Sequence, residues 1–493
     1  MHNFANNNTY YFFQISQCKD LIRLSLEGLS YFHTYHQTTL LSCVSLAYLF
    51  IIRTLFLSVA QRTKISELTI RLTYRQLGVA FVMIVFCYNY GLPLQSYVFA
   101  LLPIFAYDSL RIPDRNKISD TNINWIQIPF HAIGVVMLVF TFHHRWILSI
   151  LLVCIASHHL YRYSMNMYNG RRIILGSMLS YSNLYAGSLL LLAVFPVLPI
   201  VGTRDPNNYL LVLAGISWLV YSKYRVGQED SSTSSRVVNV QRCILGVTIV
   251  HIVLWSGSEP YRLQLLVSWL ILAISPLCIL FSPVDPQMRL NSIGLGLAPP
   301  FILLCTSYEV LFLLLLFIHL ICWYRIETSN TWSYQSSYKD LKSGNMEQGF
   351  LILAYLFLCF FGLGNIASVS SYNWTCVRFF LTVFSPFTML SFVLLKIFIP
   401  FLLVSCVVRA IHMVQHSRCD SRGEAELVLQ VVLGFCDMMG IVFLYQVRNT
   451  GSWKQIGLSI SHVVIVHSIT LALLCLYILA SYLIPSARYK RNY

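Results

Sequence analysis

The sequence predicts an all-α fold, a polytopic transmembrane helix bundle with about 13 to 15 spanning segments. Of the 493 residues, 57% are hydrophobic and only 11% are charged, whereas a typical soluble domain has about 25% charged residues. The apolar residues also form long runs that recur along the whole chain. Such a chain cannot cover a soluble globule with polar surface, so the lipid bilayer is the solvent that suits it.

The apolar runs define the segments in order. A spanning helix needs about 20 apolar residues, and fifteen stretches approach this length, several of them short. They lie near residues 39–60, 77–91, 93–108, 124–142, 146–160, 179–201, 208–222, 237–256, 263–281, 291–306, 308–324, 348–365, 381–407, 426–446 and 457–484. The pairs 77–108 and 291–324 each predict either a tight hairpin or a broken helix, because Gly91-Leu92-Pro93 and Ser307-Tyr308-Glu309 are typical of turns.

Lysine and arginine are distributed unevenly between the connecting loops. Loops after odd-numbered segments and the C-terminal tail hold about three times as many as the other loops and the N-terminal stub. By the positive-inside rule this bias predicts a lumenal N-terminus and a cytosolic C-terminus. The net charge of +15 then arises from lysine and arginine in the loops. Nucleic acid is therefore not an expected partner.

The predicted domains follow from this topology. Residues 1–38 form a lumenal N-terminal stub with an amphipathic lead-in, 39–485 a polytopic membrane domain, and 486–493 a cytosolic tail. Two glycosylation signals, at Asn7 and Asn373, both fall on the predicted lumenal side and mark these residues as glycosylation candidates.

Two charges lie deep inside predicted spans, where each costs roughly 2.5–3.5 kcal/mol. Lys396 lies near the middle of segment 381–407, where it binds an anionic head group or pairs with an acid of the bundle. Asp437, within segment 426–446, is the expected partner if the two helices pack together. A purely structural ion pair is the alternative interpretation.

A polar hairpin precedes the last segment and contains Ser452, Trp453, Ser459 and His462. Ser459 and His462 stand at i and i+3, so they share a helix face and can form a polar cluster. Helix capping and interhelical hydrogen bonding are the structural alternative. The candidate lipid or head-group contacts are therefore Lys396, Asp437, Ser452, Trp453 and His462.

No pattern of catalytic or metal-ligating residues is visible. The sequence lacks a Gly-x-Ser-x-Gly elbow, a P-loop, a His-Glu-x-x-His helix and any Asp/His cluster at ligand spacing. The fourteen cysteines are scattered and form no Cys-x-x-Cys pair. The residues alone thus predict no catalytic residue, no metal site and no cofactor in this chain.

Several strings nevertheless resemble the C-terminal membrane region of the PIG-N-type GPI ethanolamine phosphate transferases. They are Leu26-Glu27-Gly28-Leu29, Ala193-Val194-Phe195-Pro196-Val197-Leu198-Pro199, Gly364-Asn365-Ile366-Ala367-Ser368, Leu381-Thr382-Val383-Phe384-Ser385-Pro386-Phe387, Lys396-Ile397-Phe398-Ile399-Pro400-Phe401, and the run from Gly451-Ser452-Trp453 to Ser459-Ile460-Ser461-His462. The chain departs from the family pattern beside Gly-Ser-Trp, where Asn449-Thr450 and Lys454-Gln455 replace acidic residues.

The resemblance implies an enzyme of the endoplasmic reticulum membrane that transfers phosphoethanolamine from phosphatidylethanolamine to the first mannose of the GPI precursor. In the family this chemistry belongs to a lumenal, alkaline-phosphatase-like domain that uses a divalent metal. No string of that domain occurs here, so no catalytic residue is carried over. The catalytic domain is expected to be a separate or missing part.

The chain is therefore interpreted as the membrane region of such a transferase, presenting lipid donor and glycolipid acceptor to a catalytic domain. Two other classes remain open. One is a non-catalytic lipid transporter or scramblase, and the other is a scaffold for proteins of GPI-anchor synthesis.

Overall fold

The computed structural model describes residues 2–35, 37–61, 69–70, 73–107, 110–111, 127–168, 175–201, 206–226, 232–255, 262–333, 340–364, 374–419, 424–448 and 451–485. Its α-helices are α1 (His2–Thr34), α2 (Gln37–Gln61), α3 (Tyr74–Asn89), α4 (Leu94–Ala106), α5 (Gln127–Thr141), α6 (Trp146–Tyr168), α7 (Leu175–Leu192), α8 (Asn208–Val226), α9 (Ser232–Val253), α10 (Arg262–Leu277), α11 (Pro286–Leu303), α12 (Glu309–Ser333), α13 (Asp340–Gly362), α14 (Pro386–Cys419), α15 (Glu424–Gln446) and α16 (Trp453–Leu483).

Short elements complete the described chain. Three 3₁₀ turns are η3 (Phe195–Val197), η5 (Cys278–Phe281) and η7 (Trp374–Val377). The strands β1 (Thr69–Ile70) and β2 (Leu110–Arg111) form an antiparallel two-residue ladder. These pieces lie between helices and do not alter the helical class.

The predicted helical bundle is confirmed. Each of the fifteen apolar stretches corresponds to one helix from α2 to α16 in the described chain. Eight helices are long and apolar enough to cross a membrane, and four shorter apolar helices accompany them. The number of actual crossings stays a prediction. The two ambiguous pairs, residues 77–108 and 291–324, are each a hairpin of two helices. Gly91 at the α3–α4 turn has a φ of 61°, a backbone conformation that favours glycine.

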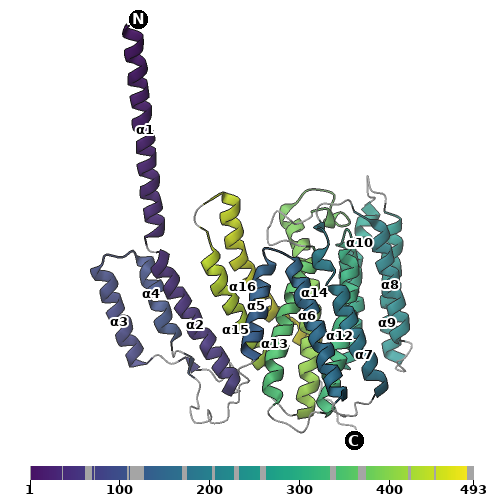
Figure 1. The fold of residues 1–493 in the computed structure, drawn as a ribbon. Coiled ribbons are helices and arrows are strands. Elements are labelled where there is room, and N and C mark those ends of the chain that lie inside the picture. The colour runs from purple at the N-terminus through teal and green to yellow at the C-terminus, as the bar shows by residue number, and fades with distance from the viewer. Residues whose placement is uncertain are drawn as a thin grey trace.

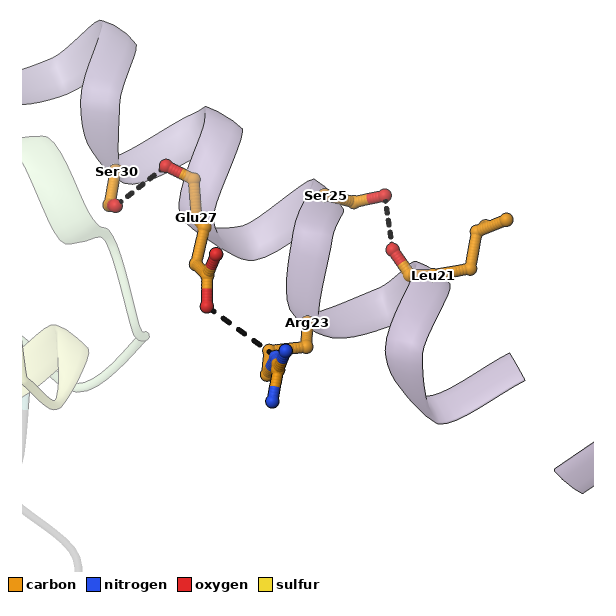
Figure 2. A network of polar contacts seen from close by, with 5 residues as sticks. All are labelled: Leu21, Arg23, Ser25, Glu27 and Ser30. Atoms are coloured by element: carbon orange, nitrogen blue, oxygen red, sulfur yellow. Dashed lines mark hydrogen bonds and ion pairs between the residues drawn. The ribbon is translucent and has the colours of Figure 1, made fainter. Parts of the chain in front are cut away.

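Helix α1 extends away from the bundle as a single exposed rod (Figure 1). Figure 2 shows a set of polar contacts within this helix. Arg23 Nε lies 3.5 Å from Glu27 Oε1, and Ser25 and Ser30 donate to the carbonyls of Leu21 and Glu27. Such i,i+3 and i,i+4 contacts stabilise an isolated helix only slightly, and the main packing partner of α1 in the described chain is α2.

The core of the described chain is formed by α11 to α15. About two thirds or more of the spanning windows of α12 to α15 are buried, whereas a third or less of those of α2, α9, α10 and α16 are. The outer helices expose large apolar side chains such as Leu49, Val250, Leu270 and Leu471. A bilayer would cover this surface, since lipid accepts apolar side chains but not unpaired backbone groups.

From α2 onward, consecutive helices run in opposite directions (Figure 1), and hydrogen bonds join helix ends that lie on the same side of the bundle. At the end where α2 begins, Arg145 before α6 donates to Phe361 O near the end of α13, and Tyr308 before α12 donates to Pro199 O after α7. At the other end, Arg289 near the start of α11 donates to Leu483 O at the end of α16. We name the first of these the α1-side end, because α1 joins the bundle there (Figure 1).

Close helix contacts depend on glycine at a few positions. A Cβ on Gly294 of α11 would overlap the ring of Phe317 on α12. That ring lies between Trp218 and Tyr221 of α8, with ring centroids 5.3 and 5.5 Å away. The ring therefore has no room to move aside.

We expect Gly294→Ala to lower the stability of the bundle by about 1–3 kcal/mol, the usual cost of overpacking a core. The measurement is the thermal unfolding midpoint of the purified protein in detergent. Gly246→Ala on α9 is the matched control, because a Cβ there meets nothing within 4 Å. An equal midpoint for the two variants would contradict the packing described.

Candidate lipid head-group site

A buried ion pair lies at the α1-side end of the bundle. Lys396 Nζ on α14 is 2.8 Å from Oε1 of Glu309, the first residue of α12, and their side chains are 10% and 0% exposed. The predicted Lys396–Asp437 pair is therefore wrong. The reason is packing: α14 lies along α12, and the long lysine side chain reaches the start of that helix.

Glu309 also begins its own helix. Its Oε1 accepts hydrogen bonds from the backbone N–H of Thr306 at 2.7 Å and from the Thr306 hydroxyl at 3.4 Å. A carboxylate is favourable at this position because helix N-termini carry unpaired N–H groups and partial positive charge. Glu309 Oε2 has no hydrogen-bond partner among the described residues.

The thiol of Cys376, on η7, is near enough to interact electrostatically with the pair. Burial raises the pKa of this thiol, an effect that Lys396 partly offsets. The thiol is therefore protonated and neutral at physiological pH. Lys396 and Glu309 accordingly balance each other's charge.

A row of polar contacts continues from the ion pair across the α1-side end. Tyr308, next to Glu309, donates its hydroxyl hydrogen to Pro199 O at 2.6 Å and interacts with the guanidinium of Arg145. Arg145 in turn donates to Phe361 O at 3.2 Å. The row thus joins the ends of α6, α7, α12 and α13 to Lys396 of α14.

His462 lies at the same end on α16 and is buried, with 4% of its surface exposed. Its ring contacts Phe142, with centroids 5.2 Å apart, and Phe142 in turn contacts Phe361 at 5.4 Å. The exposed His143 ring lies 5.4 Å from His462. His462 Nε2 has no hydrogen-bond partner in the described part of the chain.

The predicted Ser459–His462 cluster is confirmed only as a shared face. Both side chains are buried, but they make separate contacts. Ser459 accepts a hydrogen bond from the Arg448 N–H at 3.1 Å and donates to Ile456 O. The serine thus closes the α15–α16 turn.

Ser452 and Trp453 have different environments. Ser452 is the N-cap of α16 and forms a capping box with Gln455, so its side chain stabilises the helix start. Trp453 follows it and is 90% exposed. An exposed indole at the end of a spanning helix is typical of an anchor at the membrane interface.

Asp437 lies apart from Lys396, on the side of α15 that faces α2 and α16. Its carboxylate interacts electrostatically with His467 of α16 and Tyr48 of α2. The glycosylation candidates have no described environment. Asn7 lies in α1 but its side chain is outside the described set, and Asn373 lies outside the described residues.

The sequence interpretation missed Glu309, Tyr308, Arg145, Tyr48 and His467. Glu309 and Tyr308 were visible only as parts of a turn, and Arg145 as a loop charge after two histidines. Among the described residues, no group of three His, Cys, Asp or Glu side chains is placed to hold a metal ion. The described residues therefore do not fit the divalent metal that the resemblance implies.

The chain was compared with known families and proteins. A family model described as "Phosphatidylinositolglycan class N (PIG-N)" matches residues 27–452, a range that includes Arg145, Glu309, Lys396 and Asp437. The chain belongs to the PIG-N family. The match ends at Ser452, so Trp453 and His462 lie just beyond it.

Curated relatives of this PIG-N family member carry the name GPI ethanolamine phosphate transferase 1. The Homo sapiens protein is 31% identical over 94% of this chain and 53% of its own length. The Mus musculus protein is 30% identical over the same shares, and the Saccharomyces cerevisiae protein 25% identical over 91% of this chain and 50% of its own length. The chain spans about half the length of these relatives. No solved structure matches it.

The buried ion pair of this PIG-N chain predicts a non-additive mutational response. Glu309→Gln leaves the Lys396 ammonium buried without a counter-charge, and we expect a loss of about 3–5 kcal/mol. Lys396→Met should cost a similar amount, and the double variant less than the sum, because neither charge remains. The measurement is thermal stability of the purified variants.

Glu347→Gln is the control for this series. It breaks the Arg162–Glu347 pair at the other end of the bundle, where the side chains are 49% and 31% exposed. Such a pair contributes about 0–1 kcal/mol. Strictly additive losses at Lys396 and Glu309 would contradict a direct interaction between them.

Proposed function

We propose that this chain is the membrane region of a GPI ethanolamine phosphate transferase. The proposed reaction moves phosphoethanolamine from phosphatidylethanolamine to the first mannose of the GPI precursor in the endoplasmic reticulum membrane. The observation that carries the proposal is the family match over residues 27–452, together with relatives that are named GPI ethanolamine phosphate transferase 1. A catalytic domain that uses a divalent metal would act from outside this chain.

The proposed task of the bundle is to hold the lipid-linked donor and acceptor at its α1-side end. Two features support this task. Arg145 supplies a cation beside the exposed His143 and His144. Buried polar atoms of Arg145, Glu309 and His462 lack partners within the described chain, and buried polar groups normally bond to a neighbour, a water or a ligand.

The proposed orientation places the α1-side end in the lumen. The excess of lysine and arginine in the loops of the opposite end supports it, because such loops stay in the cytosol. The N-terminus would then be lumenal and the C-terminus cytosolic. Phosphoethanolamine transfer would take place on the lumenal side, where α1 extends from the bundle.

The transfer reaction is tested in cells whose own copy of the gene is replaced by variants. We expect His462→Ala and Trp453→Ala to reduce transfer by about tenfold, which corresponds to about 1.4 kcal/mol of lost lipid interaction. The measurement is mass spectrometry of GPI precursors. Precursors that lack phosphoethanolamine on the first mannose should accumulate at normal expression of the variant protein.

Two matched controls separate contact from folding. His412 on α14 is buried with an unpartnered Nδ1 but lies toward the other end, and Trp146 begins α6 at the α1-side end with 52% exposure. Alanine at either position should leave transfer unchanged. Unchanged precursors in the His462 and Trp453 variants would make these residues structural. Unchanged precursors after disruption of the whole gene, with lipid movement by the purified chain in liposomes, would instead favour the transporter class.

A further inference from the structure

The α3–α4 hairpin lies at the edge of the bundle, where α4 packs along α2 (Figure 1). Its helices have 16 and 13 residues, which correspond to lengths of about 24 and 20 Å at about 1.5 Å per residue. The hydrocarbon core of a typical bilayer is about 30 Å thick. Neither helix is therefore long enough to cross an undeformed bilayer.

The hairpin extends only to the middle of α2. The ring of Tyr107, directly after α4, lies 5.0 Å from the ring of Phe50. Phe50 stands 50 − 37 = 13 residues after Gln37 and 61 − 50 = 11 residues before Gln61, the two ends of α2. The Gly91 turn at the opposite end of the hairpin lies beside the start of α2 (Figure 1). The hairpin therefore covers the α1-side half of α2.

The end of the hairpin at this depth is polar. We define the hairpin base as Thr73, Arg75, Gln76 and Tyr107. Gln76 accepts a hydrogen bond from the Thr73 N–H at 2.9 Å and donates to the carbonyl of Tyr107, so the base ties the start of α3 to the end of α4. The ladder of β1 and β2 adjoins the base in the chain, and Arg75 is exposed. Strand edges and a charged side chain are unfavourable in hydrocarbon.

A second exposed charge lies close to this depth on α2. Arg53 follows Phe50 by three residues, so it shares the face of α2 that meets the hairpin base. Its side chain is exposed, and it stands 61 − 53 = 8 residues, about 12 Å, before the end of α2. An arginine can extend toward a membrane surface, but the backbone of the hairpin base cannot. Water and head groups are therefore needed near the middle of α2, from the side opposite the α1-side end.

A bilayer adapts to a short apolar element by becoming thinner around it. The exposed apolar side chains of α3, such as Phe81 and Val82, need hydrocarbon beside the α1-side half of α2, whereas the hairpin base needs water. The opposite leaflet then has to bend inward along the other half of α2. A head group that crosses there traverses less hydrocarbon, and the free-energy cost of burying its polar atoms is lower.

We propose that the hairpin base and Arg53 form a lipid-crossing edge, a thinned strip of bilayer along α2 at which phospholipids pass between the two leaflets. The chemistry that the edge recognises is the phosphate group that phospholipids share, because Arg53 and Arg75 are both cations. The lipid moves along an open surface, so we expect no preference among head groups that carry this phosphate. The activity is additional to phosphoethanolamine transfer.

The test measures lipid crossing by the purified full chain in liposomes, without any transfer reaction. A phosphatidylcholine with a fluorescent acyl chain is placed in both leaflets, and a membrane-impermeant reductant bleaches the outer leaflet. We expect crossing to be about tenfold faster than in liposomes without protein, which corresponds to a barrier lower by about 1.4 kcal/mol. A phosphatidylethanolamine with the same label should cross at the same rate. A trapped soluble dye establishes that the liposomes do not leak.

Removal of single charges separates the edge from the rest of the chain. We expect Arg53→Leu and Arg75→Leu each to slow crossing about threefold, and the double variant about tenfold, because each change removes one cation that attracts phosphate. Arg262→Leu is the matched control, since Arg262 is also exposed but is the first residue of α10. It should keep the wild-type rate. Thermal stability and gel filtration establish that each variant is folded.

Thiol labelling in nanodiscs measures the thinning itself. Arg75→Cys introduces a thiol at the hairpin base, and Phe81→Cys introduces one six residues later, in the exposed apolar part of α3. Native Cys154 is an exposed thiol eight residues into α6. A water-soluble maleimide should modify the Arg75→Cys thiol about tenfold faster than the other two, because only a thiol in water ionises to the reactive thiolate. Peptide mass spectrometry assigns each modified site.

The proposal is overturned if the wild-type chain moves lipid no faster than liposomes without protein, if the folded double arginine variant keeps the wild-type rate, or if Arg262→Leu slows crossing equally. An Arg75→Cys thiol that reacts as slowly as Cys154 would also overturn it. Protection of that thiol in a dimer of the chain would assign the hairpin to a protein contact instead. The crossing assay does not depend on transfer, so failure of either proposal leaves the other standing.

Discussion

The structure depends on one constraint: in the apolar interior of a bilayer, every polar group needs a partner within the protein. The helices satisfy the backbone, and glycines such as Gly294 let them approach closely enough to bury their faces. Polar side chains within the spanning segments have fewer possible partners. Lys396 meets the constraint through Glu309 at 2.8 Å, and this contact ties α14 to the start of α12 in the most buried part of the bundle.

The same constraint makes the unpaired groups informative. Buried polar atoms without partners in the described part of the chain occur in Arg145, Glu309 and His462 at the α1-side end. A soluble protein could satisfy such groups with bulk water at low cost. In a bundle surrounded by lipid, head groups and interfacial water are the natural partners, and both are concentrated at the membrane surface.

The fold could be predicted from sequence because hydropathy is a strong signal when the solvent is lipid. All fifteen apolar stretches correspond to helices. The two ambiguous pairs, residues 77–108 and 291–324, each consist of two helices joined by a turn. The pairing of Lys396 could not be predicted, because hydropathy says nothing about which helices are neighbours. Glu309 lies at the boundary between two apolar stretches, where an acidic side chain costs little free energy. The hydropathy pattern therefore does not mark it as a candidate.

The candidate site could be predicted only in part, because local spacing shows which residues share a helix face but not which helices are neighbours. Local spacing correctly placed Ser459 and His462 on one buried face, and Ser452 at a helix start, where capping was one of the two interpretations. It could not show that Phe142 contacts both His462 and Phe361, whose carbonyl accepts from Arg145, or that His467 and Tyr48 meet from helices more than 350 positions apart in the sequence. These contacts are tertiary, and only the packing of α2 and α16 on α15 creates them.

The central claim is that the α1-side end of the bundle handles lipid head groups. Photo-crosslinking with a phosphatidylethanolamine that carries the reactive group on its head group, followed by peptide mapping, tests it most directly. The account predicts crosslinks on peptides around Arg145 and His462, and none around Arg162 or Glu347 at the other end. Crosslinks spread evenly over both ends, or confined to the Arg162–Glu347 end, would contradict it.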